Sequence, residues 1–472
     1  MKLGKILVGL AIVAAVLGGG FLYAKSGITK GVQAYLYAYP MVMMSATRDA
    51  TVDSTRYNAV NHSRTFPDHA FRRVVRPNVD TLYSTVWFDL ADGPAVLELP
   101  DSGGRYYLMP IHDAWTNVTT SIGSRTTGNG PQGYLVTGPD WTGDVPEGLT
   151  VITSPTNTAW AIGRSDTAAA NADGSPSDDM KATYEFQSAM SVTPLPRWLM
   201  GERNRQETIE PSGDNDLQTA KIVADMDAET FYTTFYSFLR GNPAPAEDAP
   251  FWDSVMKSFG FVDPNAEGAD GYWMYGDLSA LNRWLLEAAY ARIPSVMEMI
   301  GAARKYDEMG WRNMPGAGVP LGRYGTNYGL RAYVAHIGLG ANEAIDAVYP
   351  GAERDFDGAP LNGNTRYKLH FKADELPPVK GFWSLTLYGA DAYLFDSAIK
   401  RYAVGGRDAL RYNADGSLDL FVQADAPANE ADYANWLPSP KGETFALTMR
   451  LYWPKQRVLD GNWKMPSIEV VN

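Results

Sequence analysis

Residues 76–83 read Arg76-Pro77-Asn78-Val79-Asp80-Thr81-Leu82-Tyr83 and lead on to Trp87, so that a polar turn runs directly into an alternating strand. Pro77 fixes one backbone angle and biases the residue before it toward an extended conformation. Asn78 and Asp80 can bond to nearby backbone groups and hold a turn, and the alternation that follows predicts a strand with at least one buried face. The stretch therefore places a cation, an amide and a carboxylate at the lip of a sheet, either as a binding site or as a hydrogen-bonded structural corner.

Composition excludes several classes of protein. A chain of 472 residues that is 45% hydrophobic and 12% aromatic is large enough for roughly two to four domains with substantial cores. The net charge of −13 argues against nucleic-acid binding, which needs a basic surface. The chain has no cysteine, which excludes disulfides and thiolate metal sites. We predict neither a metal nor another cofactor, because no metal-binding spacing joins the five histidines, which are His62, His69, His112, His336 and His370. The alternative left open is a calcium or magnesium site built from carboxylates.

The N-terminal residues have the pattern of a membrane element. Lys2 and Lys5 precede an apolar run from Ile6 to Ala24, and Lys25 closes it. A helix of that length nearly spans a hydrocarbon core of about 30 Å. We therefore expect residues 1–25 to be an uncleaved signal-anchor that crosses the inner membrane once, with the globular part in the periplasm. The alternative is a signal peptide whose cleavage releases a secreted protein.

After the N-terminal residues, the hydrophobic pattern of the chain changes from strand-like to helical and then back to strand-like. Short alternating runs separated by Gly, Pro and Asp clusters predict an antiparallel β-sandwich or jelly roll over residues 58–166, and the same pattern returns over residues 351–472. Residues 26–57 predict a helix, and residues 167–350 predict a mostly helical region. The predicted fold class is a multi-domain α+β chain, in which two antiparallel sandwich or jelly-roll-like domains flank a helical middle region after a membrane anchor.

The two β regions also echo each other. Asp113-Ala114-Trp115 follows a strand in the first region, and Asp391-Ala392-Tyr393 follows a similar strand in the second. The echo favours two sandwiches of related design, and the cleft between such domains is a preferred place for a ligand.

Further strings accompany the opening stretch: Tyr106 to Trp115, Gly381 to Tyr388, Asn435 to Pro438 and Met449 to Pro454. Together with residues 76–83 they resemble a family of bacterial proteins that carry two domains of unknown function, numbered 1254 in the N-terminal part and 1214 in the C-terminal part. The resemblance implies two β-sandwich domains with helices between them, in an envelope or secreted protein. It implies no particular activity.

His112 and Asp113 lie at the far end of a predicted strand, close to Trp115 and Asn117. A histidine beside a carboxylate can act as a general base near neutral pH. The alternative is that His112 caps the strand and Asp113 starts a turn. With Asp80 from the opening stretch, these two residues are the predicted catalytic groups.

A second polar set lies on a predicted helix near residue 328, where Tyr324, Tyr328 and Arg331 share one face. Arginine and tyrosine together can bind a carboxylate, sulfate or phosphate. The alternative is a structural network between domains. The predicted substrate-binding residues are Arg76, Asn78, Tyr83, Trp115, Asn117, Tyr324, Asn327, Tyr328 and Arg331.

Familiar catalytic signatures are missing: the chain has no Gly-x-Ser-x-Gly elbow, phosphate-binding loop or dinucleotide fingerprint. We therefore predict a periplasmic or envelope protein that acts without a cofactor as a hydrolase or lyase on a small polar or anionic substrate. The alternative function is a non-catalytic envelope module that binds a glycan or a partner protein. The expected partners are the small-molecule substrate and the inner membrane, through the N-terminal helix; no nucleic acid is expected, and homo-oligomer formation is left open.

Overall fold

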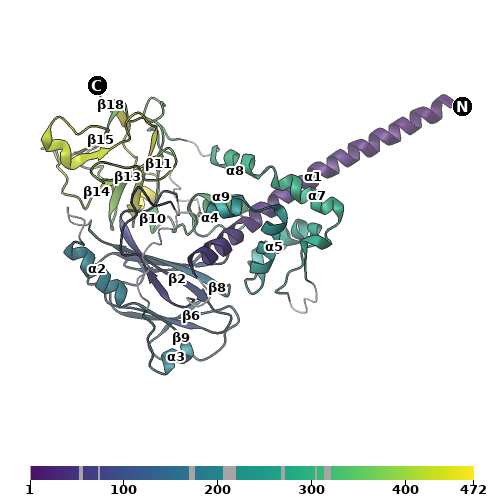
Figure 1. The fold of residues 1–472 in the computed structure, drawn as a ribbon, viewed down its shortest axis with the longest axis horizontal. Coiled ribbons are helices and arrows are strands. Elements are labelled where there is room, and N and C mark those ends of the chain that lie inside the picture. The colour runs from purple at the N-terminus through teal and green to yellow at the C-terminus, as the bar shows by residue number, and fades with distance from the viewer. Residues whose placement is uncertain are drawn as a thin grey trace.

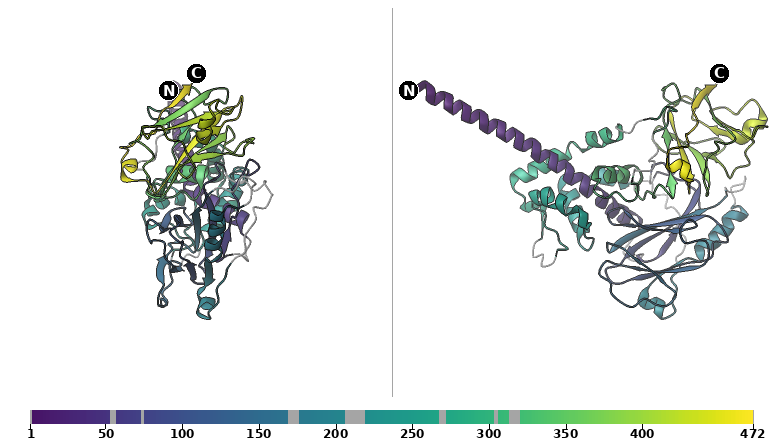
Figure 2. Two further views of the ribbon diagram at one scale, coloured as in Figure 1. Left: turned by 90° about the vertical axis from the view of Figure 1, so that its left-hand side faces the viewer. Right: turned by 180° about the vertical axis from the view of Figure 1, so that it is seen from behind.

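The computed structural model in Figure 1 is a mixed α+β, multi-domain chain with several antiparallel sheets. In Figures 1 and 2 the sheets gather on one side of the molecule, and the helices that surround α1 lie on the other side. The structure describes residues 2–52, 57–72, 75–168, 176–205, 219–266, 272–302, 306–312 and 320–471, and of these the side chains of residues 2–24 and 302 are not described.

The central element of the helical side is α1 (Lys2–Thr51). From residue 25 onward its apolar side chains recur at helical spacing and bury one face against α5 (Ala228–Leu239), α7 (Ala280–Tyr290) and α9 (Tyr328–Gly338). The ring of Tyr35 stacks on that of Phe231, with 4.2 Å between the ring centroids. The tyrosines of α1 thus pack into a protein core that helices from distant parts of the sequence complete.

The expected membrane anchor is a prediction that the structure contradicts. Within the part of the chain that the structure describes, no helix combines the length and the apolar character needed to cross a membrane. The described side chains of α1 are instead embedded in protein, and Tyr37 and Val42 are fully buried there. The side chains of the run from Ile6 to Ala24 lie outside the described residues. The predicted localisation, a single-pass inner-membrane protein with a periplasmic globular part, is therefore wrong.

The N-terminal β region consists of two sheets that share one hydrophobic core. Strand alternation sends Val86 and Met109 from the first sheet and Leu97 and Val136 from the second into this core. The pairs are antiparallel except β6 with β7. The first sheet has the order β1 (Val60–His62), β2 (Thr81–Asp89), β8 (Thr158–Asp166), β4 (Tyr107–Asp113), β5 (Val118–Gly123), and the second has the order β7 (Thr150–Thr153), β6 (Gln132–Thr137), β3 (Ala95–Leu99), β9 (Ser191–Pro194).

The C-terminal β region repeats this plan with a second shared core, to which Leu385 and Met449 contribute from one sheet and Leu369 and Leu420 from the other. Here β15 and β16 form the parallel pair. One sheet has the order β10 (Ala347–Val348), β17 (Phe445–Tyr452), β13 (Trp383–Gly389), β14 (Ala403–Gly405), with β11 (Gly351–Ala352) also paired to β17, and the other has the order β16 (Trp436–Pro438), β15 (Leu418–Gln423), β12 (Arg366–Phe371), β18 (Ile468–Val471).

Helices α5, α7 and α9 begin at polar caps that the sequence marks. Asp227 accepts a hydrogen bond from the backbone N–H of Thr230 at the start of α5, and Ser279 and Asn327 cap α7 and α9 in the same way. The other helical elements are α2 (Asp178–Ser188), α3 (Leu195–Leu199), α4 (Thr219–Ala224), η1 (Ala246–Asp248), α6 (Ala249–Ser254), η2 (Met256–Phe259), η3 (Tyr275–Asp277), α8 (Ile293–Ala302), η4 (Glu430–Asn435) and α10 (Gln456–Leu459).

Gly31 allows α1 and α7 to approach closely. A Cβ atom at Gly31 would lie 2.6 Å from the Cβ of Ala289 and 3.2 Å from the carbonyl oxygen of Leu285. Gly329 in α9 is the opposite case, because a Cβ there would meet no heavy atom within 4 Å.

We expect Gly31→Ala to lower the free energy of unfolding by about 1–3 kcal/mol, because overpacking outweighs the gain in helix propensity. Gly329→Ala should raise it by about 0.5 kcal/mol, because only the propensity term acts there. Urea denaturation followed by tryptophan fluorescence measures both. Equal effects of the two substitutions would contradict the close approach of α1 and α7.

Candidate functional site

The opening stretch forms a turn that its own side chain holds. Oδ1 of Asn78 accepts hydrogen bonds from the backbone N–H of Asp80 at 2.6 Å and of Thr81 at 3.3 Å. Arg76, just before the turn, has a φ of 51°, which is uncommon for a residue other than glycine. Its backbone N–H donates to the carbonyl oxygen of Ala392 at 2.8 Å, and Ala392 itself has a φ of 64°.

This turn docks on β13 and β17 of the C-terminal region. Nδ2 of Asn78 donates to the hydroxyl of Tyr452 at 2.7 Å, and the hydroxyl of Tyr388 donates to the carbonyl oxygen of Pro77 at 2.7 Å. Arg450 donates to the Tyr388 hydroxyl at 2.5 Å. All three C-terminal side chains are buried. The turn is therefore a polar contact between the two β regions.

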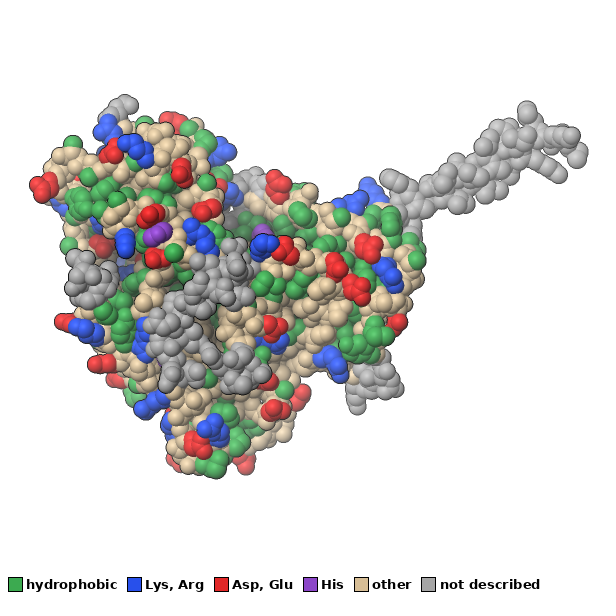
Figure 3. Space-filling model, in the orientation of Figure 1, with side chains coloured by type: hydrophobic (Ala, Val, Ile, Leu, Met, Phe, Trp, Pro, Cys, Tyr) green, Lys and Arg blue, Asp and Glu red, His purple; other side chains and the backbone are tan. Residues whose placement is uncertain are grey.

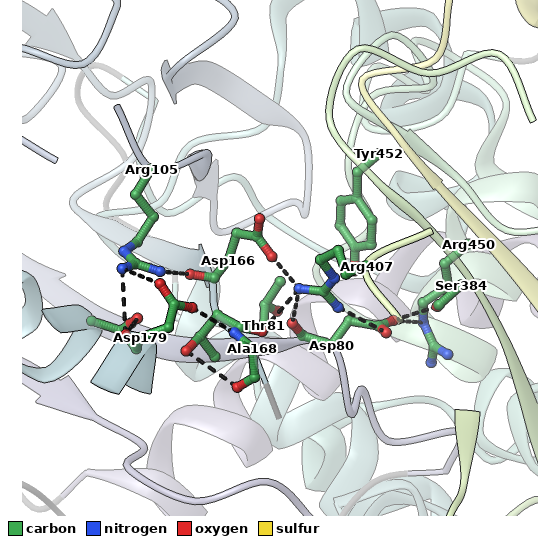
Figure 4. A network of polar contacts seen from close by, with 12 residues as sticks. Asp80, Thr81, Arg105, Asp166, Ala168, Asp179, Ser384, Arg407, Arg450 and Tyr452 are labelled. Carbon is green, nitrogen blue, oxygen red and sulfur yellow. Dashed lines mark hydrogen bonds and ion pairs between the residues drawn. The ribbon is translucent and has the colours of Figure 1, made fainter. Parts of the chain in front are cut away.

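Asp80 is the centre of this contact, as Figure 4 shows. Its carboxylate accepts hydrogen bonds from the Ser384 hydroxyl at 2.7 Å and from Arg407 at 3.3 Å. Arg407 also pairs with Asp166, so one guanidinium joins carboxylates at the ends of the neighbouring strands β2 and β8. Burial raises the pKa of Asp166 above its usual value, although Arg407 opposes that rise.

Beside this contact lies an open pocket of about 440 Å³. Its charged lining comes from distant parts of the chain: Arg76 precedes β2, Arg312 follows the helical region, and Glu353 and Arg354 follow β11. The rest of the described lining is mostly apolar: Pro360, Gly389, Ala390, Ala392, Thr444, Phe445 and Ala446.

Glu353 holds two of the three arginines. Oε1 accepts a hydrogen bond from Arg76 at 3.2 Å, and Oε2 accepts hydrogen bonds from Arg312 at 2.6 Å and from the Tyr306 hydroxyl at 2.8 Å. Burial acts to raise the pKa of Glu353, but the hydrogen bonds from Arg312 and Tyr306 outweigh it and hold the pKa below its usual value. Glu353 is therefore ionised at neutral pH, and among the described residues that line the pocket, three arginines with one carboxylate give a formal charge of +2.

The predicted catalytic pair has a different environment. His112 is fully buried, and its Nδ1 and Nε2 lie 3.3 Å and 3.2 Å from the carbonyl oxygens of Trp160 and Ala341. Burial lowers the pKa of His112 to about 4, so the ring is neutral near neutral pH. No hydrogen bond joins His112 to Asp113 among the described residues, because neighbouring residues of a strand point to opposite faces.

Asp113 instead holds the turn between β4 and β5. Oδ1 accepts hydrogen bonds from the backbone N–H of Trp115 at 2.9 Å and of Asn117 at 2.8 Å, and Oδ2 accepts one from Nδ2 of Asn117 at 3.1 Å. Burial raises the pKa of the Asp113 carboxyl to about 6, and the hydrogen bonds from Asn117 limit the rise.

Helix α9 brings several predicted residues into one buried cluster. The guanidinium of Arg331 lies over the rings of Trp115 at 5.1 Å and Tyr328 at 5.2 Å. Nη2 of Arg331 is 3.7 Å from Oδ2 of Asp248, and both side chains are 1% exposed. The Tyr328 hydroxyl donates to Oδ1 of Asp248 at 2.8 Å. Tyr324 is buried nearby, and burial raises the pKa of its phenol to about 12.

The structure thus places the predicted residues in different surroundings. Arg76, Asn78 and Asp80 belong to the contact between the β regions, and of the predicted site residues Arg76 lines the pocket. Tyr83 lies under the guanidinium of Arg164 at 5.3 Å. The residues that contribute to the α9 cluster or its supporting turns are Asp113, Trp115, Asn117, Tyr324, Asn327, Tyr328 and Arg331.

Residues 57–194 match the family described as "Protein of unknown function (DUF1254)", and residues 346–456 match "Protein of unknown function (DUF1214)". The chain belongs to the family that carries DUF1254 and DUF1214 in tandem. The first match contains the N-terminal β region, and the second contains the C-terminal β region except β18. The resemblance seen in the sequence is confirmed. A search among curated proteins finds no match.

A solved structure carries the same fold as this DUF1254–DUF1214 chain. The crystal structure of the VPA0106 protein from Vibrio parahaemolyticus is 22% identical, has a TM-score of 0.67, and covers 94% of this chain and 100% of its own. An uncharacterised protein from Burkholderia cenocepacia is 12% identical, with a TM-score of 0.44 and coverage of 97% and 98%. At this identity the first similarity shows a shared fold and nothing further.

Sequence reasoning missed most of the charged groups around the pocket and the contact. Tyr306, Arg312, Glu353 and Arg407 carry no local motif, and Asp248 lies in a short helical turn before α6. An arginine or glutamate on an irregular segment has the same local pattern whether it pairs across domains or faces solvent.

We expect Arg407→Ala to lower the free energy of unfolding by about 2 kcal/mol, because the buried Asp80 then keeps only the more distant cation Arg450, 4.0 Å away. The control is Arg411→Ala, whose partner Asp432 lies on the surface and whose own side chain is 55% exposed, so its loss should stay within about 0.5 kcal/mol. Urea denaturation compares the two. Equal losses would mean that Arg407 is an ordinary surface charge.

Asp113→Asn should change how stability depends on pH. Because the folded pKa of about 6 lies above the usual value near 4, the native state binds the extra proton, and the wild type loses stability as pH rises from 4 to 7. The asparagine variant lacks this loss, so its stability relative to wild type should rise by about 2–3 kcal/mol over that range. Thermal melts at stepped pH measure it.

Asp415→Asn is the control of opposite sign. A hydrogen bond from Ser417 holds the pKa of this exposed carboxyl below its usual value, so the carboxylate stabilises the fold above that pKa. The variant should therefore fall further below wild type as pH rises. If Asp113→Asn behaved in the same way, the assignment of a raised pKa to Asp113 would be refuted.

Proposed function

We propose that this protein binds a small anionic molecule in the pocket lined by Arg76, Arg312 and Arg354. The observation that carries the proposal is the charge of the pocket: its described lining has three guanidiniums and one carboxylate, in a chain of net charge −13. On the face that Figure 3 shows, acidic and basic side chains are interspersed. Planar guanidinium groups match carboxylate and phosphate oxygens in pairs.

The backbone of the pocket supports the same proposal. Arg76 and Ala392 both have positive φ angles, hydrogen-bond to each other and line the pocket. Each such residue costs about 1–3 kcal/mol, and residues of this kind cluster at ligand-binding and active sites. The strain is held in place by the buried contact between the turn at residues 76–81 and the C-terminal region.

The position of the pocket also favours a ligand. We interpret each pair of sheets as a β-sandwich of jelly-roll-like form, with the helical region between the two sandwiches in sequence. The pocket takes residues from the N-terminal turn, from the end of the helical region and from the C-terminal sheets, and small molecules commonly bind at such junctions.

Binding has more support than the predicted hydrolase or lyase reaction. Apart from arginine, the ionisable groups that line the pocket are Tyr306 and Glu353, and they bond to each other. A carboxylate with a lowered pKa is a weak general base at neutral pH. The residues predicted to transfer protons, His112 and Asp113, do not line this pocket. We therefore keep a small anionic molecule, the substrate class expected from the sequence, as the proposed ligand. The hydrolase or lyase reaction stays a prediction.

Calorimetric titration of the full chain with small carboxylates and phosphate esters tests the proposal. We expect at least one of them to bind, and Arg354→Ala to weaken its binding at least tenfold, because one charge-assisted contact is lost. The control is Arg457→Ala, which removes an arginine paired with Glu375 outside the pocket. The proposal fails if no anion binds, or if the two variants weaken binding equally.

A further inference from the structure

Building on the proposed function, we infer that the ligand is a dianion with an apolar body, and that Glu353 is the residue that sets this charge preference. Dicarboxylates and alkyl phosphates share this chemistry. The inference depends on how the four charged groups of the pocket are already paired with one another.

Glu353 neutralises one end of the pocket. Its two carboxylate oxygens lie 3.2 Å from a nitrogen of Arg76 and 2.6 Å from a nitrogen of Arg312, so a single negative charge is divided between two guanidiniums. These two arginines therefore present about one unmatched positive charge to a ligand.

Arg354 provides the other charge. It donates to the carbonyl oxygen of Gly358 at 2.8 Å, and no carboxylate of the described residues forms an ion pair with it. The two arginines lie close to each other because both contact the ring of Tyr306: the guanidiniums of Arg312 and Arg354 lie 5.1 Å and 5.9 Å from its centroid. A monoanion would pair with only one of these two charges, whereas a dianion can pair with both.

The apolar wall gives the second part of the inference. Pro360, Ala390 and Ala392 line the same space as the arginines and are not buried in the core, and the volume of about 440 Å³ is far larger than a single carboxylate or phosphate group. Burying an apolar body there adds affinity in proportion to the area removed from water. Inorganic phosphate carries the charge but leaves this wall uncovered.

A matched ligand series on one five-carbon chain tests the charge preference: valerate, glutarate and tricarballylate, which carry one, two and three carboxylates at pH 8. We expect glutarate to bind the full-length protein at least tenfold more tightly than valerate, because each unmatched charge in a partly buried site weakens binding by about a factor of ten. Butyl phosphate and inorganic phosphate form the second arm, which separates phosphate esters from dicarboxylates and measures the contribution of the apolar body.

Two variants move the charge of the pocket in opposite directions. Glu353→Gln makes it +3, so tricarballylate should become the tightest ligand of the series. Arg354→Gln makes it +1, so the advantage of glutarate over valerate should disappear. Glu375→Gln is the control, because it removes a carboxylate from an Arg457 pair outside the pocket and should leave the order unchanged.

The outcomes separate this inference from the proposed function. If valerate binds as tightly as glutarate and both need Arg354, the site binds anions but the dianion inference is wrong. If none of these ligands binds, the proposed function itself is wrong. If Glu353→Gln fails to fold, as a thermal melt would show, the decision rests on Arg354→Gln, whose side chain lies at the surface.

Discussion

A carboxylate removed from water needs cations and donors around it, and in this molecule that requirement ties the two β regions together. The side chain of Asp80 is 4% exposed. Its donors and cations, Ser384, Arg407 and Arg450, all belong to the C-terminal region. Removing one of these partners would leave the buried charge less well compensated and destabilise the contact. The conformation of the preceding residue, Arg76, and hence one wall of the pocket, depends on this contact.

Much of the local structure could be predicted from the sequence, because it depends on residues that lie within about ten positions of one another in the chain. Phe231, Phe235 and Phe238 recur at helical spacing after the cap Asp227, and α5 follows that pattern. The echo between Asp113-Ala114-Trp115 and Asp391-Ala392-Tyr393 reflects a shared turn, in which each aspartate accepts a hydrogen bond from the backbone N–H two residues later. The opening stretch was also interpreted correctly as a polar turn before a strand, but Arg76 has a φ of 51° in place of the extended conformation expected before Pro77.

The pocket could not be predicted in this way, because its pairs are long-range. Arg76 and Glu353 are 277 residues apart, and Asp80 and Arg407 are 327 residues apart. A single sequence carries no signal for such pairs. Proximity along the chain was also misleading. His112 and Asp113 are neighbours, but His112 lies close to the carbonyl oxygens of Trp160 and Ala341, whereas Asp113 holds the turn between β4 and β5. The N-terminal apolar run was interpreted from its length and its flanking lysines, whereas the described side chains that follow it in the same helix pack against α5, α7 and α9.

The hydrogen bond between Asn78 and Tyr452 joins residues 374 positions apart, and this has a consequence for biosynthesis. At about 5–20 residues per second, a ribosome needs about 20 to 75 s to add the residues that separate them. Until these partners are synthesised, the nascent N-terminal sheets display the amide of Asn78 and the acid of Asp80 to solvent without their native acceptor and donors. Cellular quality control would therefore meet a long-lived, half-finished chain, and translation speed across the helical segment becomes a variable in the yield of this protein.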